Sequence, residues 1–281
     1  MSIKDILLSL TSYPIPTQRR AVEHAVALAE GLEARVRAVA FQVDVQSPIG
    51  LYADPVGVSG ILAADGRKSA HNASDLLEYF EKIAAARGVA HDCSPLVCRL
   101  HEIPERLVAE AQSCDIAIVS LREAETIELD IAESLIFGSG RPVLVLPQDP
   151  KRDMPTSLKH VAVAWDNSRP ATRAIADALP FLREADEVRL FTVVDDKPID
   201  RSPSVAKLAR HLARHGVEII SEDVKCNGRA IGDVFNAYVV EHRSDLLVMG
   251  AYGHSRLREF ILGGATQSML GHPPTWILLS H

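Results

Sequence analysis

The sequence has few aromatic residues, few cysteines and no long apolar run, and each shortage narrows the class of protein. Aromatic residues make up 5% of the 281 positions while hydrophobic residues make up 47%, so aliphatic side chains and alanine must build the core. This balance favours helices packed on a parallel sheet over an all-β sandwich. Four cysteines are too few for a disulfide framework in a chain of this length, and reduced thiols are expected.

The apolar runs and the charge restrict the partners. No run approaches the roughly 20 residues that span a bilayer, and residues 1–5 lead directly into an expected strand, which predicts a cytoplasmic protein with no membrane partner. The formal net charge of −7 disfavours a nucleic-acid binder. Residues 1–150 carry 13 basic and 21 acidic side chains, whereas residues 151–281 carry 17 and 16, so an anionic ligand would prefer the second half.

Strand and helix patterns alternate along the whole chain. In the first half, strands are expected at 3–10, 35–43, 91–100, 116–120 and 143–146, and helices at 17–32, 69–87, 104–113 and 128–137. In the second half, strands are expected at 160–165, 188–194, 217–225, 246–249 and 275–279, and helices at 169–183, 202–215 and 231–242. This order predicts an α/β protein of two tandem Rossmann-like domains, each a five-stranded parallel sheet flanked by helices.

Two stretches interrupt this plan. Residues 147–155 (PQDPKRDMP) are the expected linker, which divides the chain into domains at 1–147 and 156–281. Residues 47–68 are rich in glycine and proline and are interpreted as an insertion in the first domain. Both a lid over a site and an inert surface excursion are compatible with that composition.

The two domains form an internal repeat. Residues 113–120 (SCDIAIVS) match residues 243–250 (RSDLLVMG), and residues 141–146 (RPVLVL) match the closing strand. Each domain ends in an apolar strand with a free edge, and pairing these two edges would join the domains as an intramolecular pseudo-dimer. Two such chains could also associate as a homodimer.

The stretch 246–266 (LLVMGAYGHSRLREFILGGAT) carries the most information about function. An apolar strand breaks at Gly250, and Gly253 is followed by a short segment of helical periodicity and then by Gly263 and Gly264. Turns of this kind present free backbone N–H groups that bind phosphate, although ordinary strand-to-helix turns give the same spacing. A Walker A lysine and a G-x-G-x-x-G loop are both absent.

One spacing resembles the G-x-x-G-(nine)-G-[ST] signature of the universal stress protein family: Gly250 and Gly253 are followed, after nine residues, by Gly263. Nearly the entire chain resembles the tandem, two-domain form of that family. The resemblance implies a stress-response protein whose second domain binds ATP or a related adenine nucleotide, with or without Mg²⁺. Gly264 stands where the family has Ser or Thr, so a phosphate-binding hydroxyl is missing. The nucleotide contacts implied for this chain are Ala164, Trp165, Asp166, Val193, Met249, Gly250, Gly253, His254, Gly263, Gly264, Ala265 and Thr266.

Several of these residues have a second interpretation. Asp166 could bond a ribose or an adenine edge, or cap the following helix, and the two roles are compatible. Val193 could form an apolar wall. Trp165 is large for its position and could stack on a base or obstruct it. His254 could pair with a phosphate or belong to a solvated helix face.

The first domain lacks the corresponding residues. Residues 120–123 (SLRE) stand in place of the first glycine turn, only Gly138 and Ser139 resemble the second, and the first strand ends in residues 10–12 (LTS) without an aspartate. Side chains then occupy the positions of close approach. The first domain is therefore expected to be degenerate.

Other chemistry receives little support. His91, Cys93, Cys98 and His101 are reminiscent of a metal site, but Cys93 and Cys98 should face opposite sides of an extended strand. No G-x-S-x-G elbow supports a hydrolase built on Asp166, Ser168 and His254. The sequence predicts no catalytic and no metal-binding residues, a regulatory role and at most slow ATP hydrolysis. The alternatives are a nucleotide-independent protein that binds another small ligand or a protein partner, and a phosphohydrolase or nucleotidyl transferase on the same fold.

Overall fold

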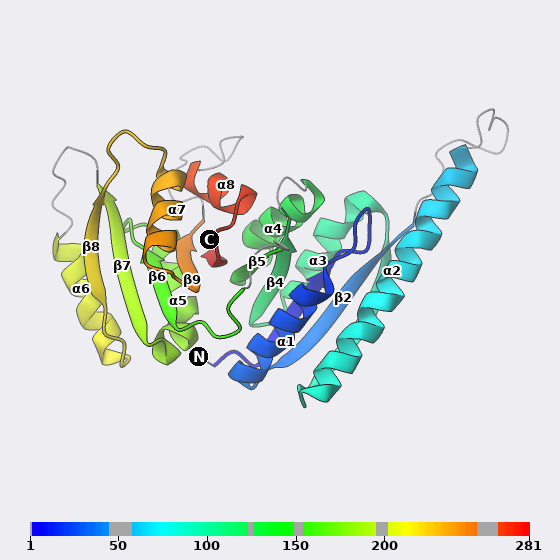
Figure 1. Ribbon diagram of the computed structural model, residues 1–281, viewed down its shortest axis with the longest axis horizontal. Coiled ribbons are helices and arrows are strands. Elements are labelled where there is room, and N and C mark those ends of the chain that lie inside the picture. Colours follow the sequence, from blue (N-terminus) through cyan, green and yellow to red (C-terminus); the bar gives the residue numbers. More distant parts are fainter. Residues whose placement is uncertain (1, 45–57, 123–125, 149–153, 195–201, 252–263) are drawn as a thin grey trace.

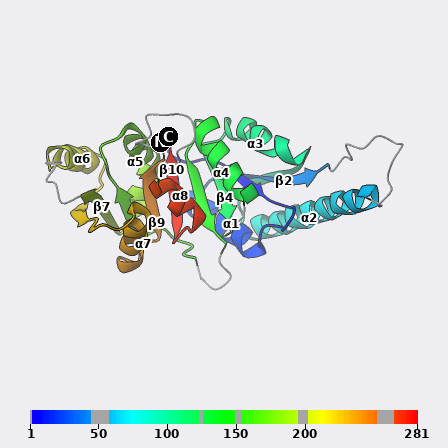
Figure 2. The same cartoon turned by 90° about the horizontal axis from the view of Figure 1, so that it is seen from above.

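The computed structural model describes residues 2–44, 58–122, 126–148, 154–194, 202–251 and 264–281. Within these residues, ten strands form one continuous sheet, with helices on both faces (Figure 1 and Figure 2). The strand order is β3-β2-β1-β4-β5-β10-β9-β6-β7-β8, so each half contributes five neighbouring strands. The predicted fold class is confirmed.

The first half supplies the elements that Figure 1 shows on the right. They are β1 (Asp5–Leu10), α1 (Arg19–Leu32), β2 (Arg35–Val43), α2 (Val58–Ala86), β3 (His91–Cys98), the short 3₁₀ turn η1 (Leu100–Glu102), α3 (Ile103–Ala111), β4 (Ile116–Leu121), α4 (Thr126–Gly138) and β5 (Val143–Pro147). All neighbouring strands of this half run parallel. The connections between them are therefore crossovers that place helices on the faces of the sheet.

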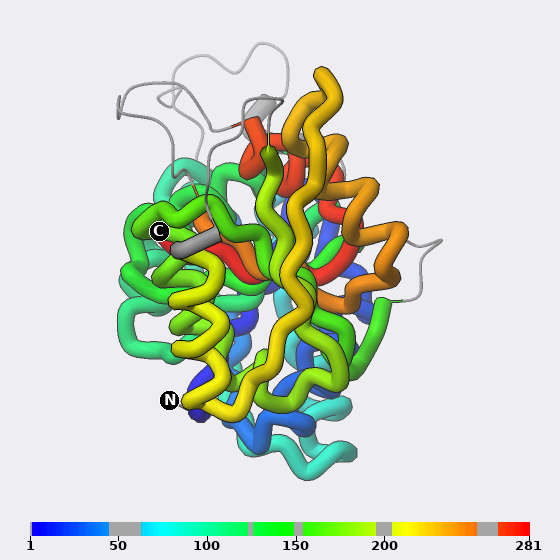
Figure 3. Tube along the Cα trace, turned by 90° about the vertical axis from the view of Figure 1, so that its left-hand side faces the viewer, coloured from blue at the N-terminus to red at the C-terminus, as the bar shows by residue number. Residues whose placement is uncertain are grey.

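The second half repeats this arrangement. Its elements are β6 (His160–Ala164), α5 (Arg169–Glu184), β7 (Glu187–Val194), α6 (Ser202–Arg214), β8 (Ile220–Lys225), α7 (Ile231–Glu241), β9 (Leu246–Gly250), α8 (Gly264–Gly271) and β10 (Trp276–Ser280). Figure 3 faces the outer edge of this half and shows β8 between α6 and α7. The short helix expected between Gly253 and Gly263 lies outside the described residues.

The two halves are joined by the antiparallel pair β5 and β10. Leu144 lies opposite Leu278, and Val145 lies opposite Ile277. The expected pairing of the two terminal edges is confirmed. It leaves neither strand with an unpaired edge, because the backbone groups of each bond those of the other. The linker residues 149–153 lie outside the described residues, so the domain limits at 147 and 156 stay predictions.

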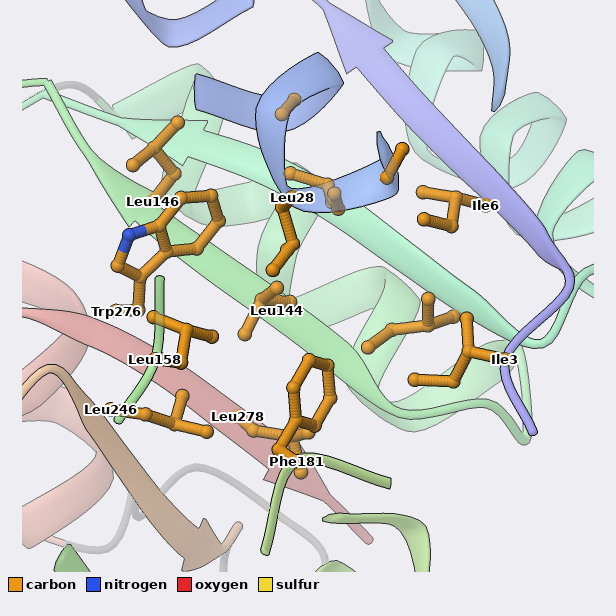
Figure 4. Close-up of a cluster of buried hydrophobic side chains, with 14 of the residues drawn as sticks. Ile3, Ile6, Leu28, Leu144, Leu146, Leu158, Phe181, Leu246, Trp276 and Leu278 are labelled. Atoms are coloured by element: carbon orange, nitrogen blue, oxygen red, sulfur yellow. The ribbon is translucent and has the colours of Figure 1, made fainter. Parts of the chain in front are cut away.

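Two hydrophobic cores, one on each face of the sheet, run across this junction. The core beneath α1, α2, α5 and α6 contains Leu144 and Leu146 from β5 together with Trp276 and Leu278 from β10 (Figure 4). Trp276 is completely buried, and its indole N–H donates to the carbonyl oxygen of Pro155 at 3.1 Å. The core beneath α3, α4, α7 and α8 contains the alternate residues of the same strands. Both cores are continuous, so the halves are packed as one folded unit.

The largest departure from the sequence prediction is α2. This helix begins at Val58 rather than at residue 69, so residues 58–68 of the expected insertion are helical, and Figure 1 shows that end of α2 extending beyond the sheet. Gly60 and Gly66 argued against a helix there, because glycine is a poor helix former. Residues 45–57, which include the rest of the expected insertion, lie outside the described residues, so the lid and the inert excursion both stay predictions.

The remaining differences are small. The helix expected at 17–32 begins at Arg19 and ends at Leu32, and Glu33 adopts the left-handed conformation there, with φ of 51°. Other predicted boundaries differ from the observed ones by a few residues. No helix of the described part of the chain is both long and apolar enough to cross a membrane.

Candidate functional site

The candidate site lies where β6 and β9 leave the sheet. These are the first and fourth strands of the second half, and the strand order reverses between them. They run parallel, with Val161 opposite Leu246 and Val163 opposite Val248, so their carboxyl ends meet at one edge. The helices of this half pack on opposite faces, α5 and α6 on one core and α7 and α8 on the other. Such a switch point opens the crevice in which α/β sheets bind ligands.

The turn after β6 is built by Asp166 and Ser168. The Asp166 carboxylate accepts a hydrogen bond from the Ser168 amide at 2.9 Å, and Asn167 between them takes the left-handed conformation with φ of 62°. Ser168 is the N-cap of α5, and its hydroxyl accepts from the Ala171 amide at 3.2 Å. The helix is therefore capped by Ser168, while Asp166 fixes the turn and stays partly exposed at the edge.

Trp165 lies on the α5 and α6 face of the sheet. Its side chain is 6% exposed and belongs to the core beneath α5 and α6, and its indole N–H donates to the Ser204 hydroxyl at 3.4 Å. The neighbouring Ala164 and Met249 belong to the core on the other face. Because successive strand residues alternate between faces, the indole lies on the face of the sheet opposite to Ala164 and Met249. The geometry favours neither of the two alternatives, stacking on a base or blocking the crevice.

Gly250 ends β9 against the start of α5. A Cβ placed on this residue would lie 2.4 Å from the amide nitrogen of Ala171 and 2.6 Å from the carbonyl carbon of Pro170. Backbone atoms cannot yield that space, so any other residue would push α5 off the sheet. The glycine is explained by helix-to-strand packing, whether or not a ligand also approaches it.

The first turn of α8 faces the same edge from the other side. Gly264 opens this helix and is exposed, and within the described part of the chain no atom lies within 4 Å of the place a Cβ would take. Ala265 packs partly against the core, and the Thr266 side chain is buried. The first backbone N–H groups of a helix have no partner inside it and carry the positive end of its dipole. An anion at this edge would meet those groups.

An apolar floor lies beneath these groups. Ala164 and Met249 are buried in the core under α7 and α8, and Val193 packs against it while partly exposed. Gly253, His254 and Gly263 lie outside the described residues. The structure thus brings Asp166, Val193, Gly250 and the start of α8 to one edge of the sheet, as the parallel strand order requires.

Residues 157–280 match the model of the universal stress protein family. The second half of the chain is therefore similar to that family. None of the curated proteins matches the chain.

Solved structures extend the likeness in fold to both halves. A universal stress protein from Archaeoglobus fulgidus DSM 4304 is 15% identical and superposes with a TM-score of 0.66, covering 98% of this chain and 97% of that one. A protein from Pseudomonas aeruginosa UCBPP-PA14 is 13% identical, with a TM-score of 0.60 and coverage of 99% and 93%. The tandem arrangement of two universal-stress-protein-like domains is therefore confirmed at the level of fold.

The residue that follows Gly250 is held by contacts that have no signal in the sequence. Ala251 follows Gly250 directly, and its amide donates to the Ser280 carbonyl at 2.9 Å. The carbonyl of Ala251 lies 3.2 Å from Nδ1 of His281, whose ring contacts Phe137 of the first half edge-on, with ring centroids 5.0 Å apart. No periodicity in the sequence signals the contact between Phe137 and His281, because these residues are more than 100 positions apart.

The equivalent edge of the first half is closed by its own side chains. The Arg122 guanidinium, which follows β4, donates to the carbonyl of Ile15 at 2.8 Å and to that of Pro16 at 3.4 Å, so it bridges the loops after the first and fourth strands. Its counter-ion is Glu128, which is 1% exposed and also accepts from the Arg122 amide at 2.6 Å. The Gln148 side chain donates to Glu128 and accepts from the Gln18 amide, just before α1.

A second set of contacts closes the neighbouring strand end. Ser12 lies 2.8 Å from the Ser69 hydroxyl of α2 and donates to the Phe41 carbonyl, and Asn72 donates to the Ser12 carbonyl at 2.9 Å. The loss of a site in the first half stays a prediction. The helical part of the expected insertion contributes to these contacts, because Asp65 of α2 accepts from the Tyr13 hydroxyl at 3.3 Å.

Two further sequence interpretations can be placed. Gly138 ends α4 and Ser139 follows it, so this pair lies at the amino end of β5 and does not correspond to the turn that opens α8. Cys93 packs against one core and Cys98 lies in the other, as expected for opposite faces of β3. No cluster of three metal-ligating side chains occurs among the residues described.

A charged network on the outer strands was also missed. Arg189 of β7 pairs with Glu187 at 2.7 Å and with Glu222 of β8 at 2.6 Å, and Glu222 accepts from the Tyr238 hydroxyl of α7 at 3.2 Å. Burial and the nearby Glu222 raise the pKa of Tyr238, and the bond from Arg189 lowers the pKa of Glu187. These groups satisfy one another, so the network stabilises the outer edge of the sheet.

Proposed function

We propose that the second half of the chain binds ATP or a related adenine nucleotide at the carboxyl ends of β6 and β9, in a regulatory and largely non-catalytic role. Support comes from the match of residues 157–280 to the universal stress protein family and from the convergence of Asp166 and the first turn of α8 on one edge. A cytoplasmic stress response and association into homodimers belong to the same proposal.

The observation that carries the proposal is the open start of α8. Gly264 is exposed, no atom of the described residues lies within 4 Å of the place a Cβ would take, and the helix presents backbone N–H groups towards the edge. A nucleotide would supply a polyanion for these amides, a ribose within reach of the Asp166 carboxylate, and an apolar base against Val193. The near-neutral charge of this half, against the net negative first half, favours such a ligand.

A holding role suits these residues better than turnover. One oxygen of Asp166 is engaged by the Ser168 amide, which fixes the carboxylate in the turn. A group fixed in this way orients a ligand hydroxyl but is poorly placed to move as a general base. Any hydrolysis of a bound nucleotide should therefore be slow.

A nucleotide-independent role is the second candidate, and one observation favours it. Gly250 is required by the approach of α5, so one glycine of the pattern has a structural reason that involves no ligand. Under that reading the same edge would bind another small ligand or a protein partner. The two proposals differ in a single measurable property, the response to ATP.

The test uses the full-length protein purified without added nucleotide. After denaturation, the supernatant is analysed for adenine nucleotides by mass spectrometry, and the purified protein is titrated with Mg-ATP by calorimetry. We expect a released nucleotide or a titration with one site per chain. An empty protein that gives no heat with ATP would reject the proposal in favour of the second candidate.

A gain-of-function variant sharpens the test. Gly264→Ser restores a hydroxyl at the start of α8, where a side chain has room, and should tighten Mg-ATP binding by about tenfold, the value of one hydrogen bond to a charged group. Gly271→Ser is the matched control, because it lies at the other end of α8 and also has no neighbour within 4 Å. Equal affinities for the two variants would argue against a phosphate at Gly264.

A further inference from the structure

The carboxyl edge of the second half is in contact with the first half through two aromatic rings. Phe137 lies near the end of α4 in the first half, and its side chain is 50% exposed. Its ring meets the His281 ring at an interplanar angle of 67° with 5.0 Å between centroids, an edge-to-face arrangement.

The His281 ring passes this contact on to the end of β9. Its Nδ1 lies 3.2 Å from the carbonyl oxygen of Ala251, and a carbonyl can only accept, so Nδ1 carries the proton. Ala251 is completely buried, and its amide is already bonded to Ser280 of β10. The orientation of the peptide that follows Gly250 is therefore fixed on one side by β10 and on the other by a ring that leans on the first half.

The antiparallel seam explains why α4 reaches this edge. Because β5 and β10 run in opposite directions, the amino end of β5 and the adjoining end of α4 lie beside the carboxyl end of β10. The ligand edge of the second half thus borders the end of α4. The first half therefore contributes a helix end to a site whose strands all belong to the second half.

We propose that Phe137 is a positioning residue for the ligand edge of the second half, acting through His281 on the carbonyl of Ala251. This inference rests on the proposed function, since the edge is the one assigned to the nucleotide. It gives the first half, whose own edge is closed by Arg122, a role in tuning the affinity of the second. The ligand class it concerns is an adenine nucleotide with its phosphates.

The test compares Phe137→Ala and His281→Ala with the native protein. The exchange rate of the Ala251 amide is followed by NMR without nucleotide, and the Kd for Mg-ATP by calorimetry. We expect faster exchange in both variants and a Kd raised about three- to tenfold, the range of an aromatic pair. The double variant should be no weaker than the weaker single variant, because both substitutions break one chain of contacts.

Two controls separate positioning from a general loss of stability. Phe137→Tyr keeps the edge-to-face contact and should restore the native Kd and exchange rate. Val97→Ala removes an apolar side chain of similar exposure, 56%, from β3 at the far end of the sheet and should change neither value. All variants should keep a Tm within about 2 °C of the native protein, as expected for surface substitutions.

The failure of this inference can be told apart from the failure of the proposed function. Altered Ala251 exchange in a protein that never binds Mg-ATP overturns the nucleotide assignment and supports the coupling of the halves. Unaltered exchange and an unaltered Kd in Phe137→Ala overturn the positioning role while leaving nucleotide binding in place.

Discussion

Asp115 and Asp245 hold equivalent places in the two halves and make the same contacts. Asp115, just before β4, accepts hydrogen bonds from the amides of Lys4 and Asp5 at 2.7 and 3.0 Å. Asp245, just before β9, accepts from the amides of Lys159 and His160 at 2.9 and 2.8 Å. Each carboxylate therefore ties the start of the first strand of its half to the start of the fourth, the two strands that flank the switch point.

Removing either aspartate should destabilise the protein. Asp115→Ala or Asp245→Ala leaves two strand amides without an acceptor and should lower the free energy of unfolding by about 1–3 kcal/mol. The matching Asn variants keep a neutral acceptor and should lose less than the Ala variants. Urea denaturation measures both pairs, and Asn variants as unstable as the Ala variants would show that the bonds to the amides are not the cause.

The two glycines of the candidate site should respond in opposite ways to the same substitution. Gly250→Ala forces a Cβ into the backbone of Pro170 and Ala171 and should destabilise the protein by about 1–3 kcal/mol or more, as overpacking does. Gly264→Ala meets open space in an α-helix and should be neutral or slightly stabilising. Thermal unfolding of the two variants measures both effects. A Gly250→Ala variant as stable as the native protein would contradict the packing explanation.

The closed edge of the first half depends on a buried ion pair. Glu128→Ala would leave the Arg122 guanidinium, 12% exposed, without its counter-ion and should cost about 3–5 kcal/mol of stability. Replacing both residues together, with Arg122→Met and Glu128→Leu, should cost less than Glu128→Ala alone. Stability is read from urea denaturation, and Mg-ATP affinity should not change in the double variant, because the ligand edge lies in the other half.

Cys93 should be a slow nucleophile. Burial, followed by the nearby Glu81 and Asp92, raises the pKa of its thiol from 9.0 to about 11. At pH 8 its thiolate fraction, and with it the alkylation rate, should be roughly a hundredfold below that of an unstructured cysteine. Because the native thiol stays neutral while the unfolded one ionises, this residue also removes stability as the pH rises from about 9 to about 11.

The measurement for Cys93 is its alkylation rate by iodoacetamide as a function of pH, followed by peptide mass spectrometry. Glu81→Gln removes the carboxylate 3.4 Å from the sulfur and should move the profile to lower pH. A native profile with its midpoint near 9 would refute the shift.

The sequence contains enough to predict most of the sheet. Continuous apolar strands such as 143–146 and 276–279 can only be buried on both faces, which is why the pairing of Leu144 with Leu278 was predictable. The start of α2 was not, because Gly60 and Gly66 disfavour a helix locally. One contact of the added residues is long-range: the Tyr13 hydroxyl, after the first strand, donates to Asp65 at 3.3 Å.

The sequence predicts where the candidate site lies, but not why each of its residues is needed there. The positions of Asp166 and Gly264 at one edge follow from the parallel strand order. The need for glycine at 250 comes from α5, about 80 residues earlier in the sequence, and the Phe137–His281 contact joins the two halves. Such long-range contacts leave no periodic signal, so they emerge only from the folded structure.

The most direct test of the account is an NMR titration of the isotope-labelled full-length protein with Mg-ATP. The account predicts saturable shifts of the amides of Asp166, Gly250 and Gly264, with no shifts at Ser12 and Arg122 of the first half. A spectrum that ATP leaves unchanged, or shifts centred on Ser12 and Arg122, would contradict it.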